Sequence, residues 1–307
     1  MSKAKSVTVI GAGLMGHGIA QVFARAGHPV ILTDPDAAVL GVALARVGRN
    51  LQDEEIEPAS ILSRMSVEVR LDAAVAGADL VIEAVPERLD LKQALFAQVA
   101  RAAPEHAILA SNTSVIPITR IGESLSDEAR SRLLGTHWWN PPHLVPLVEV
   151  IRTEFTRDAV FNDTFEWLRA AGKLPVKVHR DVTGFIGNRL QHALWREAIG
   201  LIEDGVCDAE SIDLVVKNSF GLRMPVLGPM ENADLVGLEL TRAVHQVLFP
   251  ELKSTTRSAP LLDRLIDAGH VGMKSGQGLR SWTADEAEAV CSQLADHLIK
   301  MRDQQIA

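Results

Sequence analysis

The chain has 307 residues, 47% of them hydrophobic and 23% charged, which is the composition of an ordinary globular protein with room for two domains and a large core. Its formal net charge of −8 disfavours nucleic acid or an anionic membrane as the partner, since both bind basic faces. The two cysteines, Cys207 and Cys291, lie in no metal-type spacing, so we expect reduced packing residues and no metal ion.

A glycine-rich turn follows the first predicted element, a strand over residues 7–10. Gly11 permits a tight turn, Gly13 lets the backbone approach a pyrophosphate, and Gly16 lets the next helix pack against the sheet. Apolar residues at 19–26 predict that helix, whose N-terminus would face the anion. The turn therefore predicts a dinucleotide site.

The second predicted strand, residues 29–33, is followed by Asp34, twenty-one positions after Gly13. An acidic side chain at this place accepts the ribose hydroxyls of NAD and repels the 2′-phosphate of NADP. Asp36 adds to that repulsion, and no arginine directly follows. We therefore predict NAD as the cofactor.

Eight β-rich runs fall in the first 180 residues, and the first five alternate with helical patterns. This alternation predicts an α/β domain over residues 1–180, with a doubly wound, mainly parallel sheet whose ligand lies at the carboxyl ends of the strands. The last three runs have less helix between them and are expected to extend one edge of the sheet. The predicted strands are 7–10, 29–33, 67–69, 80–84, 108–111, 133–138, 147–151 and 176–179.

From residue 181 onward the strand signal disappears, and apolar residues recur at helical spacing. We therefore predict a smaller, all-helical second domain over residues 181–307. Pro229, Pro250 and the glycines at 272–278 mark breaks between its helices. Besides the helical patterns at 185–202 and 212–216, helices are expected over residues 231–248, 260–268 and 284–301.

Polar residues occur where plain packing would need apolar ones in three segments near predicted strand ends, residues 111–114, 136–142 and 181–189. Hydride transfer to nicotinamide needs a base for the hydroxyl proton, and histidine has an ordinary pKa near neutrality. His137 is the leading candidate. Glu149 lies inside an apolar run, where an unpaired carboxylate is costly to bury, so it could orient His137 and raise the pKa of its imidazole.

Each candidate also has a plain structural interpretation. His137 could be a core histidine whose ring nitrogens are hydrogen-bonded, and Glu149 could point outward from an edge strand. Ser114 could cap a turn or a helix, and Asn188 could lie on an exposed helix face. The sequence leaves both interpretations open for each residue taken alone.

The ordered set of motifs resembles the short, single-chain 3-hydroxyacyl-CoA dehydrogenase family along nearly the whole chain. The resemblance implies an NAD-dependent oxidoreductase with a Rossmann domain that oxidises an L-3-hydroxy group to a ketone. So many motifs in the same order are specific for that family. The matching segments are GAGLMG at 11–16, VIEAVPE at 81–87, SNTS at 111–114, HWWNP at 137–141, LVEV at 147–150, GFIGNR at 184–189, GP at 228–229 and KSGQG at 274–278.

The resemblance implies roles for single residues. His137 would be the base, and Glu149 would orient it. Ser114 and Asn188 would hold the substrate oxygen. Besides Gly11, Gly13, Gly16 and Asp34, the residues that would contact the cofactor are Leu14, Met15, Ala84, Glu87, Lys92 and Asn112, with Glu87 and Lys92 beside the nicotinamide ribose and carboxamide.

Two departures from the acyl-CoA pattern concern the substrate. Acyl-CoA members resemble one another in carrying lysines after the second strand, whereas residues 46–57 are acidic at their end, which would weaken contacts to the CoA phosphates. Arg223 stands where those members have a small or apolar residue, and it could clamp a free carboxylate or pair with Glu231 or Asp234. The clamp would resemble the branches that oxidise small free hydroxy acids, such as gulonate, carnitine and pyridine-carboxylate dehydrogenases.

Trp138, Trp139 and Asn140 are further candidates for substrate contact, because an indole ring can stack on a flat or cationic substrate. We therefore predict an enzyme acting on a small free hydroxy carboxylate. The alternatives are an L-3-hydroxyacyl-CoA dehydrogenase and a non-catalytic, crystallin-like NAD-binding protein. The intact pair of His137 and Glu149 argues against the second alternative.

The location and assembly of the protein also follow from simple patterns. The first strand begins too early to leave room for a targeting peptide, and no apolar run approaches the ~18 residues of a membrane span. We therefore expect a cytoplasmic protein. Large apolar faces of the helical second domain, together with the family resemblance, predict a homodimer.

Overall fold

The computed structural model describes residues 5–306 and divides into two compact units. Unit 1 contains the residues up to Asn188 together with those from Ala295 onward, and unit 2 contains Arg189–Leu294. The sequence placed the boundary after residue 180 and assigned the whole C-terminal segment to the second domain. The division differs at both places, because the segment before Asn188 is hydrogen-bonded to the sheet and Arg302 forms an ion pair with Glu54 of unit 1.

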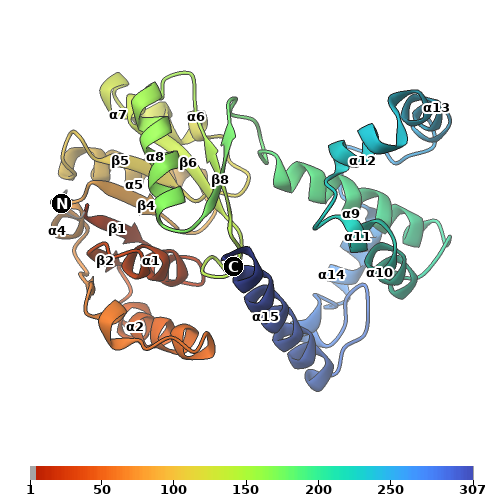
Figure 1. Cartoon of the computed structure of the whole chain (residues 1–307), viewed down its shortest axis with the longest axis horizontal. Helices are drawn as coiled ribbons and strands as arrows, with labels where there is room; N and C mark the ends of the chain where they lie inside the picture. The colour runs from red at the N-terminus through yellow and green to blue at the C-terminus, as the bar shows by residue number, and fades with distance from the viewer. Residues whose placement is uncertain (1–4, 307) are drawn as a thin grey trace. The chain divides into compact units, whose positions relative to one another are not determined.

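An eight-stranded sheet forms the centre of unit 1 (Figure 1). Its strand order is β3-β2-β1-β4-β5-β6-β7-β8, and within the described residues only the pairing of β6 with β7 is antiparallel. The predicted doubly wound sheet is confirmed, including the last three strands at one edge. The strands are β1 (Val7–Ile10), β2 (Val30–Thr33), β3 (Met65–Val67), β4 (Leu80–Glu83), β5 (Ile108–Ser111), β6 (Leu133–Trp138), β7 (Leu147–Ile151) and β8 (Leu174–Val178).

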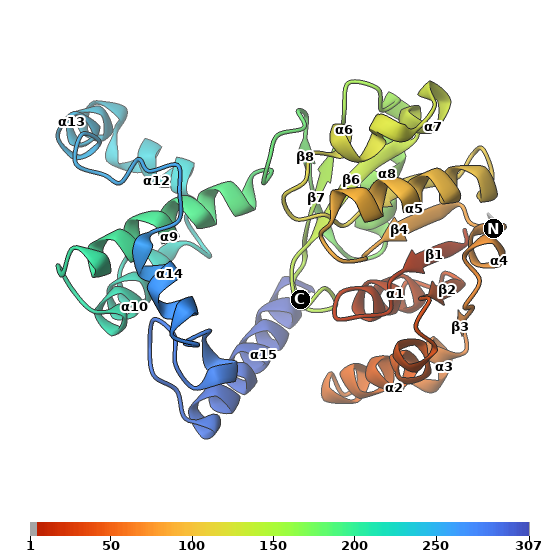
Figure 2. The same cartoon turned by 180° about the vertical axis from the view of Figure 1, so that it is seen from behind.

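Helices pack on both faces of this sheet, because alternate strand residues point to opposite sides (Figures 1 and 2). Val7 and Val9 enter a core with α1, α2, α3 and α8, whereas Ile10 enters the core formed with α4, α5, α6 and α7. The helices of unit 1 are α1 (Gly16–Arg25), α2 (Ala37–Asp53), α3 (Ala59–Leu62), α4 (Leu71–Val75), α5 (Leu89–Ala102), α6 (Ile118–Ile121), η1 (Gly122–Ser124), α7 (Asp127–Ser131) and α8 (Asp158–Ala170).

Unit 2 is helical, as the spacing of its apolar residues predicts. The single helix expected over residues 231–248 is wrong, since Gly237 has φ = +93° and divides it into α12 and α13. A short helix, α11, was not predicted. The C-terminal helices are α9 (Gly187–Glu203), α10 (Ala209–Asn218), α11 (Phe220–Arg223), α12 (Pro229–Val236), α13 (Leu238–Leu248), α14 (Pro260–Asp267), η2 (Met273–Ser275) and α15 (Ala284–Ile306).

The described residues give two further findings, one on membrane-spanning helices and one on the cysteines. None of their helices is both long and apolar enough to cross a membrane. Cys207 and Cys291 are unpaired thiols. Cys291 was expected to pack inside the protein but is exposed.

Candidate active site

The antiparallel pairing of β6 and β7 places His137 directly opposite Glu149 in the sheet. Both side chains are buried, and His137 Nδ1 lies 2.7 Å from Glu149 Oε2. Since a carboxylate only accepts, the imidazole donates its Nδ1–H. His137 Nε2 makes no hydrogen bond within the described part of the chain. The structure therefore brings together the base and the partner that the sequence suggested, with one ring nitrogen left free.

Three hydrogen bonds hold Glu149. Its Oε1 accepts the backbone N–H groups of Ile186 at 2.8 Å and of Gly187 at 3.1 Å, where α9 begins. Burial alone would raise the pKa of Glu149, but these bonds and the one from His137 hold it below its ordinary value of 4.5. Glu149 is thus ionised at neutral pH and fixes the imidazole in the tautomer with a free Nε2.

The two residues predicted to hold the substrate oxygen, Ser114 and Asn188, are also neighbours. Asn188 Nδ2 donates to the backbone carbonyl of Ser114 at 2.8 Å. The Gly184 N–H donates to the carbonyl of Val115 at 3.3 Å. These contacts fasten the loop after β5 to the start of α9, the same segment that binds Glu149. The four predicted catalytic residues therefore form one connected site.

The dinucleotide turn has the geometry that its glycines predict. Gly11 has φ = +96°, and a Cβ there would lie 2.6 Å from the Ala84 carbonyl oxygen. A Cβ on Gly16 would lie 1.6 Å from the carbonyl oxygen of Gly11, so the helix can start only with glycine at this point. A Cβ on Gly13 would meet no atom within 4 Å. The space over Gly13, at the N-terminus of α1, fits the close approach of a pyrophosphate.

Asp34 lies at the end of β2, next to the same turn. Its Oδ2 accepts the Ala12 N–H at 2.9 Å, and its Oδ1 accepts the Asp36 N–H at 2.9 Å. Asp36 itself caps α2. Leu14 is exposed and Met15 is half-buried just before α1. The turn and the two carboxylates thus fit the adenosine side of NAD.

A buried charged network at the end of β4 was not predicted. Glu83 Oε1 accepts Lys92 Nζ at 2.6 Å, and Glu83 Oε2 accepts Ser111 Oγ at 2.6 Å. Lys92, only 1% exposed, also lies 3.3 Å from Glu87 Oε2. The sequence signal was available, since Glu83 interrupts an apolar strand in the same way as Glu149. Lys92 is enclosed, and its ammonium contacts Glu83, Glu87 and the carbonyl of Val85.

Glu87 joins this network to the loop after β5. Its Oε1 accepts Thr113 Oγ1 at 2.5 Å and the Ser114 N–H at 2.9 Å. Burial alone would raise the pKa of Glu87, but the bond from Thr113, the charge of Lys92 and the backbone donors hold it below its ordinary value. In the same loop, Asn112 Oδ1 accepts the Trp138 N–H at 3.0 Å. These residues set the shape of the loop that carries Ser114.

The structure corrects the prediction that Trp138 contacts substrate. Its side chain is 2% exposed in the core, with its ring centroid 5.9 Å from that of Phe23. The reason is strand alternation: Trp138 follows His137 on β6 and therefore points to the opposite face of the sheet.

A buried lysine supports the loop between β6 and β7. Lys173 Nζ donates to the backbone carbonyls of Pro142 at 2.5 Å and Val145 at 2.9 Å, and it lies 5.3 Å from the centroid of the Trp138 ring. Burial lowers the pKa of Lys173 to about 7. Burial likewise lowers the pKa of His143, in the same loop, to about 4. His143 is therefore neutral at pH 7.

The remaining substrate candidates lie in different settings. The Trp139 ring lies beside His137, with the ring centroids 5.2 Å apart, and Asn140 is exposed in the following loop. Arg223 is exposed in unit 2 and forms no ion pair within the described part of the chain. Glu231, one of its two possible partners, instead accepts the Gly228 N–H at 2.7 Å.

Comparison with protein families gives two matches that together span most of the chain. Residues 6–182 match the 3-hydroxyacyl-CoA dehydrogenase NAD-binding domain. Residues 184–282 match the 3-hydroxyacyl-CoA dehydrogenase C-terminal domain. The first match identifies the dinucleotide turn as part of an NAD-binding domain.

Relatives of two kinds match this chain over most of its length and over most of their own. The 5-formyl-3-hydroxy-2-methylpyridine 4-carboxylate 5-dehydrogenase of Mesorhizobium japonicum is 34% identical over 97% of each chain. A probable 3-hydroxybutyryl-CoA dehydrogenase of Bacillus subtilis is 38% identical over 89% of this chain and 96% of its own. Among solved structures, an NAD⁺-dependent 5-formyl-3-hydroxy-2-methylpyridine 4-carboxylic acid 5-dehydrogenase matches with a TM-score of 0.89, 34% identity and 98% coverage of each chain.

Proposed function

The chain belongs to the 3-hydroxyacyl-CoA dehydrogenase family and is an NAD-dependent oxidoreductase, and from this premise we propose that it oxidises a hydroxyl group of a small free carboxylate with His137 as the base. The hydrogen bond of 2.7 Å between His137 and Glu149 carries this proposal. In the neutral imidazole this bond places the proton on Nδ1, so Nε2 carries the lone pair that can accept a proton.

The chemistry follows from this arrangement. NAD, when bound, accepts the hydride that leaves the substrate carbon. His137 Nε2 takes the hydroxyl proton as the carbon–oxygen double bond forms, and the anionic Glu149 stabilises the resulting imidazolium. Ser114 and Asn188 hold the substrate oxygen near Nε2. In the reverse direction the imidazolium returns the proton to the same oxygen.

A free carboxylate as substrate is supported by three observations. The match to the pyridine-carboxylate dehydrogenase extends over 97% of both chains, and the solved structure of that activity has a TM-score of 0.89. Arg223 forms no ion pair with Glu231 or Asp234, so its guanidinium is available to a bidentate carboxylate. The acidic end of the segment 46–57 disfavours CoA phosphates.

An acyl-CoA substrate is the second candidate, favoured by the 38% identity to the Bacillus subtilis relative. A panel of free and CoA-linked 3-hydroxy acids, together with pyridine carboxylates bearing hydroxymethyl or formyl groups, distinguishes the two. We expect NADH formation with a free acid and with NAD in preference to NADP. Turnover of 3-hydroxybutyryl-CoA above every free acid would assign the chain to the acyl-CoA branch, and NAD binding without turnover would point to a non-catalytic protein.

Arg223 gives a second test of the substrate class. If it binds a carboxylate, Arg223→Met raises KM for the true substrate about tenfold or more, because a charge-assisted pair worth ~1.5–3 kcal/mol is lost. NADH affinity should stay unchanged. A silent Arg223→Met would contradict the carboxylate clamp, since a thioester carbonyl carries no charge to pair.

We also propose that the protein is a homodimer held together by unit 2. Every residue of this unit is described, and only Gly200 is buried. A folded unit of this size normally buries an apolar core of its own. Along α13 the apolar side chains of Leu240, Val244, Val247 and Leu248 recur at helical spacing, and all are exposed. Such a surface needs a partner, and a second copy offers the same apolar surface.

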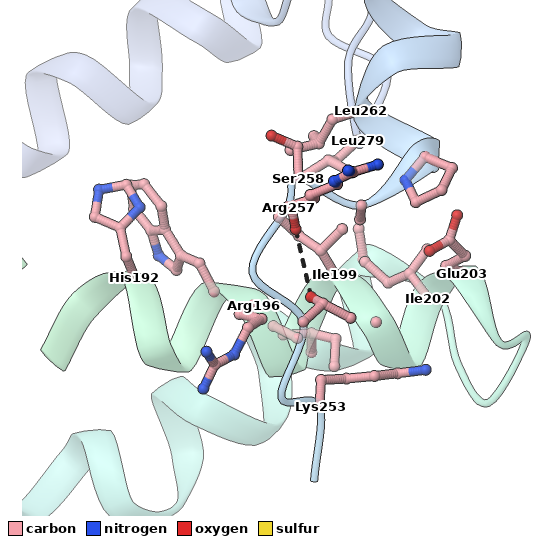
Figure 3. Close-up of a pocket in the computed structure, with 18 of the residues that line it drawn as sticks. His192, Arg196, Ile199, Ile202, Glu203, Lys253, Arg257, Ser258, Leu262 and Leu279 are labelled. Carbon is pink, nitrogen blue, oxygen red and sulfur yellow. Dashed lines mark hydrogen bonds between the residues drawn. The ribbon is translucent and has the colours of Figure 1, made fainter. Parts of the chain in front are cut away.

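Unit 2 also contains a large cavity that fits this proposal (Figure 3). Its volume is about 1210 Å³, and its lining comes from α9, α10, α14 and the segments 253–259 and 279–282. Ile199, Ile202 and Leu262 form part of its apolar wall. Figures 1 and 2 show α13 apart from α10 and α14, and α13 contributes none of the residues that line the cavity. We assign the cavity to the interface with a second copy.

A further inference from the structure

Two aromatic rings contact the imidazole of His137. The Trp139 ring centroid lies 5.2 Å from that of His137 with an angle of 54° between the planes, and the Phe185 centroid lies 5.6 Å away at 51°. His137 is 4% exposed as a result. With Nδ1 bonded to Glu149, the imidazole is restrained both at one nitrogen and against its neighbouring rings.

Gly187 connects these restraints. A Cβ on this residue would lie 2.4 Å from Trp139 Cζ2, so the indole rests directly against the first residue of α9. The N–H of Gly187 also donates to Glu149 Oε1 at 3.1 Å. One residue without a side chain thus sets the position of the indole and of the carboxylate.

Phe185 adds to this arrangement through its backbone. Its φ of +51° is rare for a residue with a side chain, yet the ring is only 1% exposed. The left-handed turn directs the next two N–H groups, those of Ile186 and Gly187, to Glu149 Oε1. A strained conformation persists where surrounding contacts determine it, and here those contacts belong to the base and its partner.

We propose that Trp139, Phe185 and Gly187 are positioning residues that fix the orientation of His137 and so direct Nε2 to the substrate hydroxyl. The proposal rests on the proposed function of His137 as the base. It changes the role expected for Trp139, because the indole packs on the imidazole instead of serving as a platform for substrate. General-base catalysis depends on the direction of the proton-accepting atom, so small rotations of the ring lower kcat.

The first test uses Gly187→Ala, with Gly41→Ala as the matched control. Gly41 also lies in a helix, and a Cβ there meets no atom within 4 Å. We expect Gly187→Ala to lower kcat about tenfold or more, with KM for NAD unchanged, because a misplacement of about 1 Å can cost ~10²-fold. Gly41→Ala should match the wild type. A normal kcat in a folded Gly187→Ala would overturn the proposal.

A compensating variant tests the contact itself. Phenylalanine lacks the Cζ2 atom of the indole, so Trp139→Phe alone should keep most of the activity. Combined with Gly187→Ala, the same substitution should restore kcat. The two effects are then strongly non-additive, as expected for residues in contact. Additive losses would contradict the proposed contact. If Gly187→Ala does not fold, Trp139→Ala removes the ring without a clash and should lower kcat while Trp139→Phe does not.

A measurement without substrate separates this inference from the proposed function. Side-chain ¹⁵N signals of His137, identified by their loss in His137→Gln, report the tautomer and the titration of the imidazole. Gly187→Ala should change both the tautomer and the pH titration of this imidazole, whereas Gly41→Ala should change neither. Shifted signals in Gly187→Ala, together with a wild-type protein that turns over no hydroxy acid, would refute the proposed function alone. Unshifted signals would refute the positioning role even in an active enzyme.

Discussion

At the scale of single residues, the site depends on buried charges that find partners. Glu149 and Glu83 both interrupt apolar strands, and both accept several hydrogen bonds inside unit 1. A buried carboxylate without such donors would protonate or destabilise the fold. For Glu149 the donors include the imidazole of His137. The interaction that stabilises the buried carboxylate therefore also fixes the tautomer of the base.

Substitution of the base is the most direct test at this scale. His137→Gln should lower kcat ~10²–10⁴-fold, which is the usual contribution of a general base. NADH binding, followed by its fluorescence, should be unaffected, because the dinucleotide turn is formed by other residues. A loss below about tenfold at neutral pH would show that another group accepts the proton.

Glu149 should give the protein a defined sensitivity to acid. Its pKa in the folded protein is lower than in the unfolded chain, so the stability it contributes is fully present above about pH 4.5 and is lost as the pH falls through its folded pKa. The difference in free energy of unfolding between wild type and Glu149→Gln should therefore shrink below pH 4.5. Urea unfolding at several pH values measures it, and a constant difference would contradict the ionised, bonded carboxylate.

At the scale of elements, connecting segments bring the site together. The start of α9 binds Glu149 and Ser114, and the loop between β6 and β7 is fastened by Lys173. Each connection uses backbone groups at the end of an element, which need partners once they are buried. These hydrogen bonds therefore fix the connecting segments to the elements that carry the site.

Lys173 predicts a pH dependence of the same sign as Glu149, but in the alkaline range. Its pKa falls from an ordinary 10.5 to about 7 on folding, so between these values the unfolded chain binds more protons than the folded one. The free energy of unfolding should therefore rise from pH 7 toward pH 10. Lys173→Met should lose this rise, whereas Lys177→Met, at a half-buried lysine whose Nζ donates to Asn162, should keep it. Urea unfolding at several pH values gives the slope of the free energy of unfolding against pH. Equal slopes for the two variants would contradict the burial of Lys173.

At the scale of the whole molecule, the two units differ in how they are stabilised. Unit 1 has two apolar cores, one on each face of its sheet. Unit 2 buries only Gly200 and exposes many large apolar side chains. Since burial of apolar surface is the main stabilising contribution to folding, unit 2 depends on further contacts for its stability.

A charge on the exposed face of α13 tests the proposed dimer. Val247 is 76% exposed in one chain, so Val247→Glu should leave a monomer intact but should place a carboxylate in the apolar interface of a dimer. We expect wild type to show twice the chain mass in light scattering and Val247→Glu to show the chain mass. Val42→Glu, on α2 of unit 1, is the control and should stay dimeric. A monomeric wild type would contradict the assembly.

Local patterns were sufficient to predict much of the molecule. The strands β1, β5, β6 and β7 have the predicted bounds, since each is a short apolar run between polar or turn residues. The dinucleotide turn was recognised from its local glycine spacing, and the requirement at Gly16 is local because a Cβ there meets the carbonyl of Gly11, whereas the requirement at Gly11 comes from the backbone of Ala84 after β4. The sequence by itself thus determined the sheet, the cofactor turn and the identity of the candidate base.

Only the tertiary structure decided which of these residues meet. The register of β6 on β7 places His137 opposite Glu149, and pairing register depends on contacts across the sheet instead of on either strand alone. Neighbouring residues of a strand point to opposite faces of the sheet, so Trp138, next to His137 on β6, lies in the core. The helix break at Gly237 and the burial of Lys173 were also decided there, because backbone conformation at a glycine and the enclosure of a charge depend on neighbours distant in sequence.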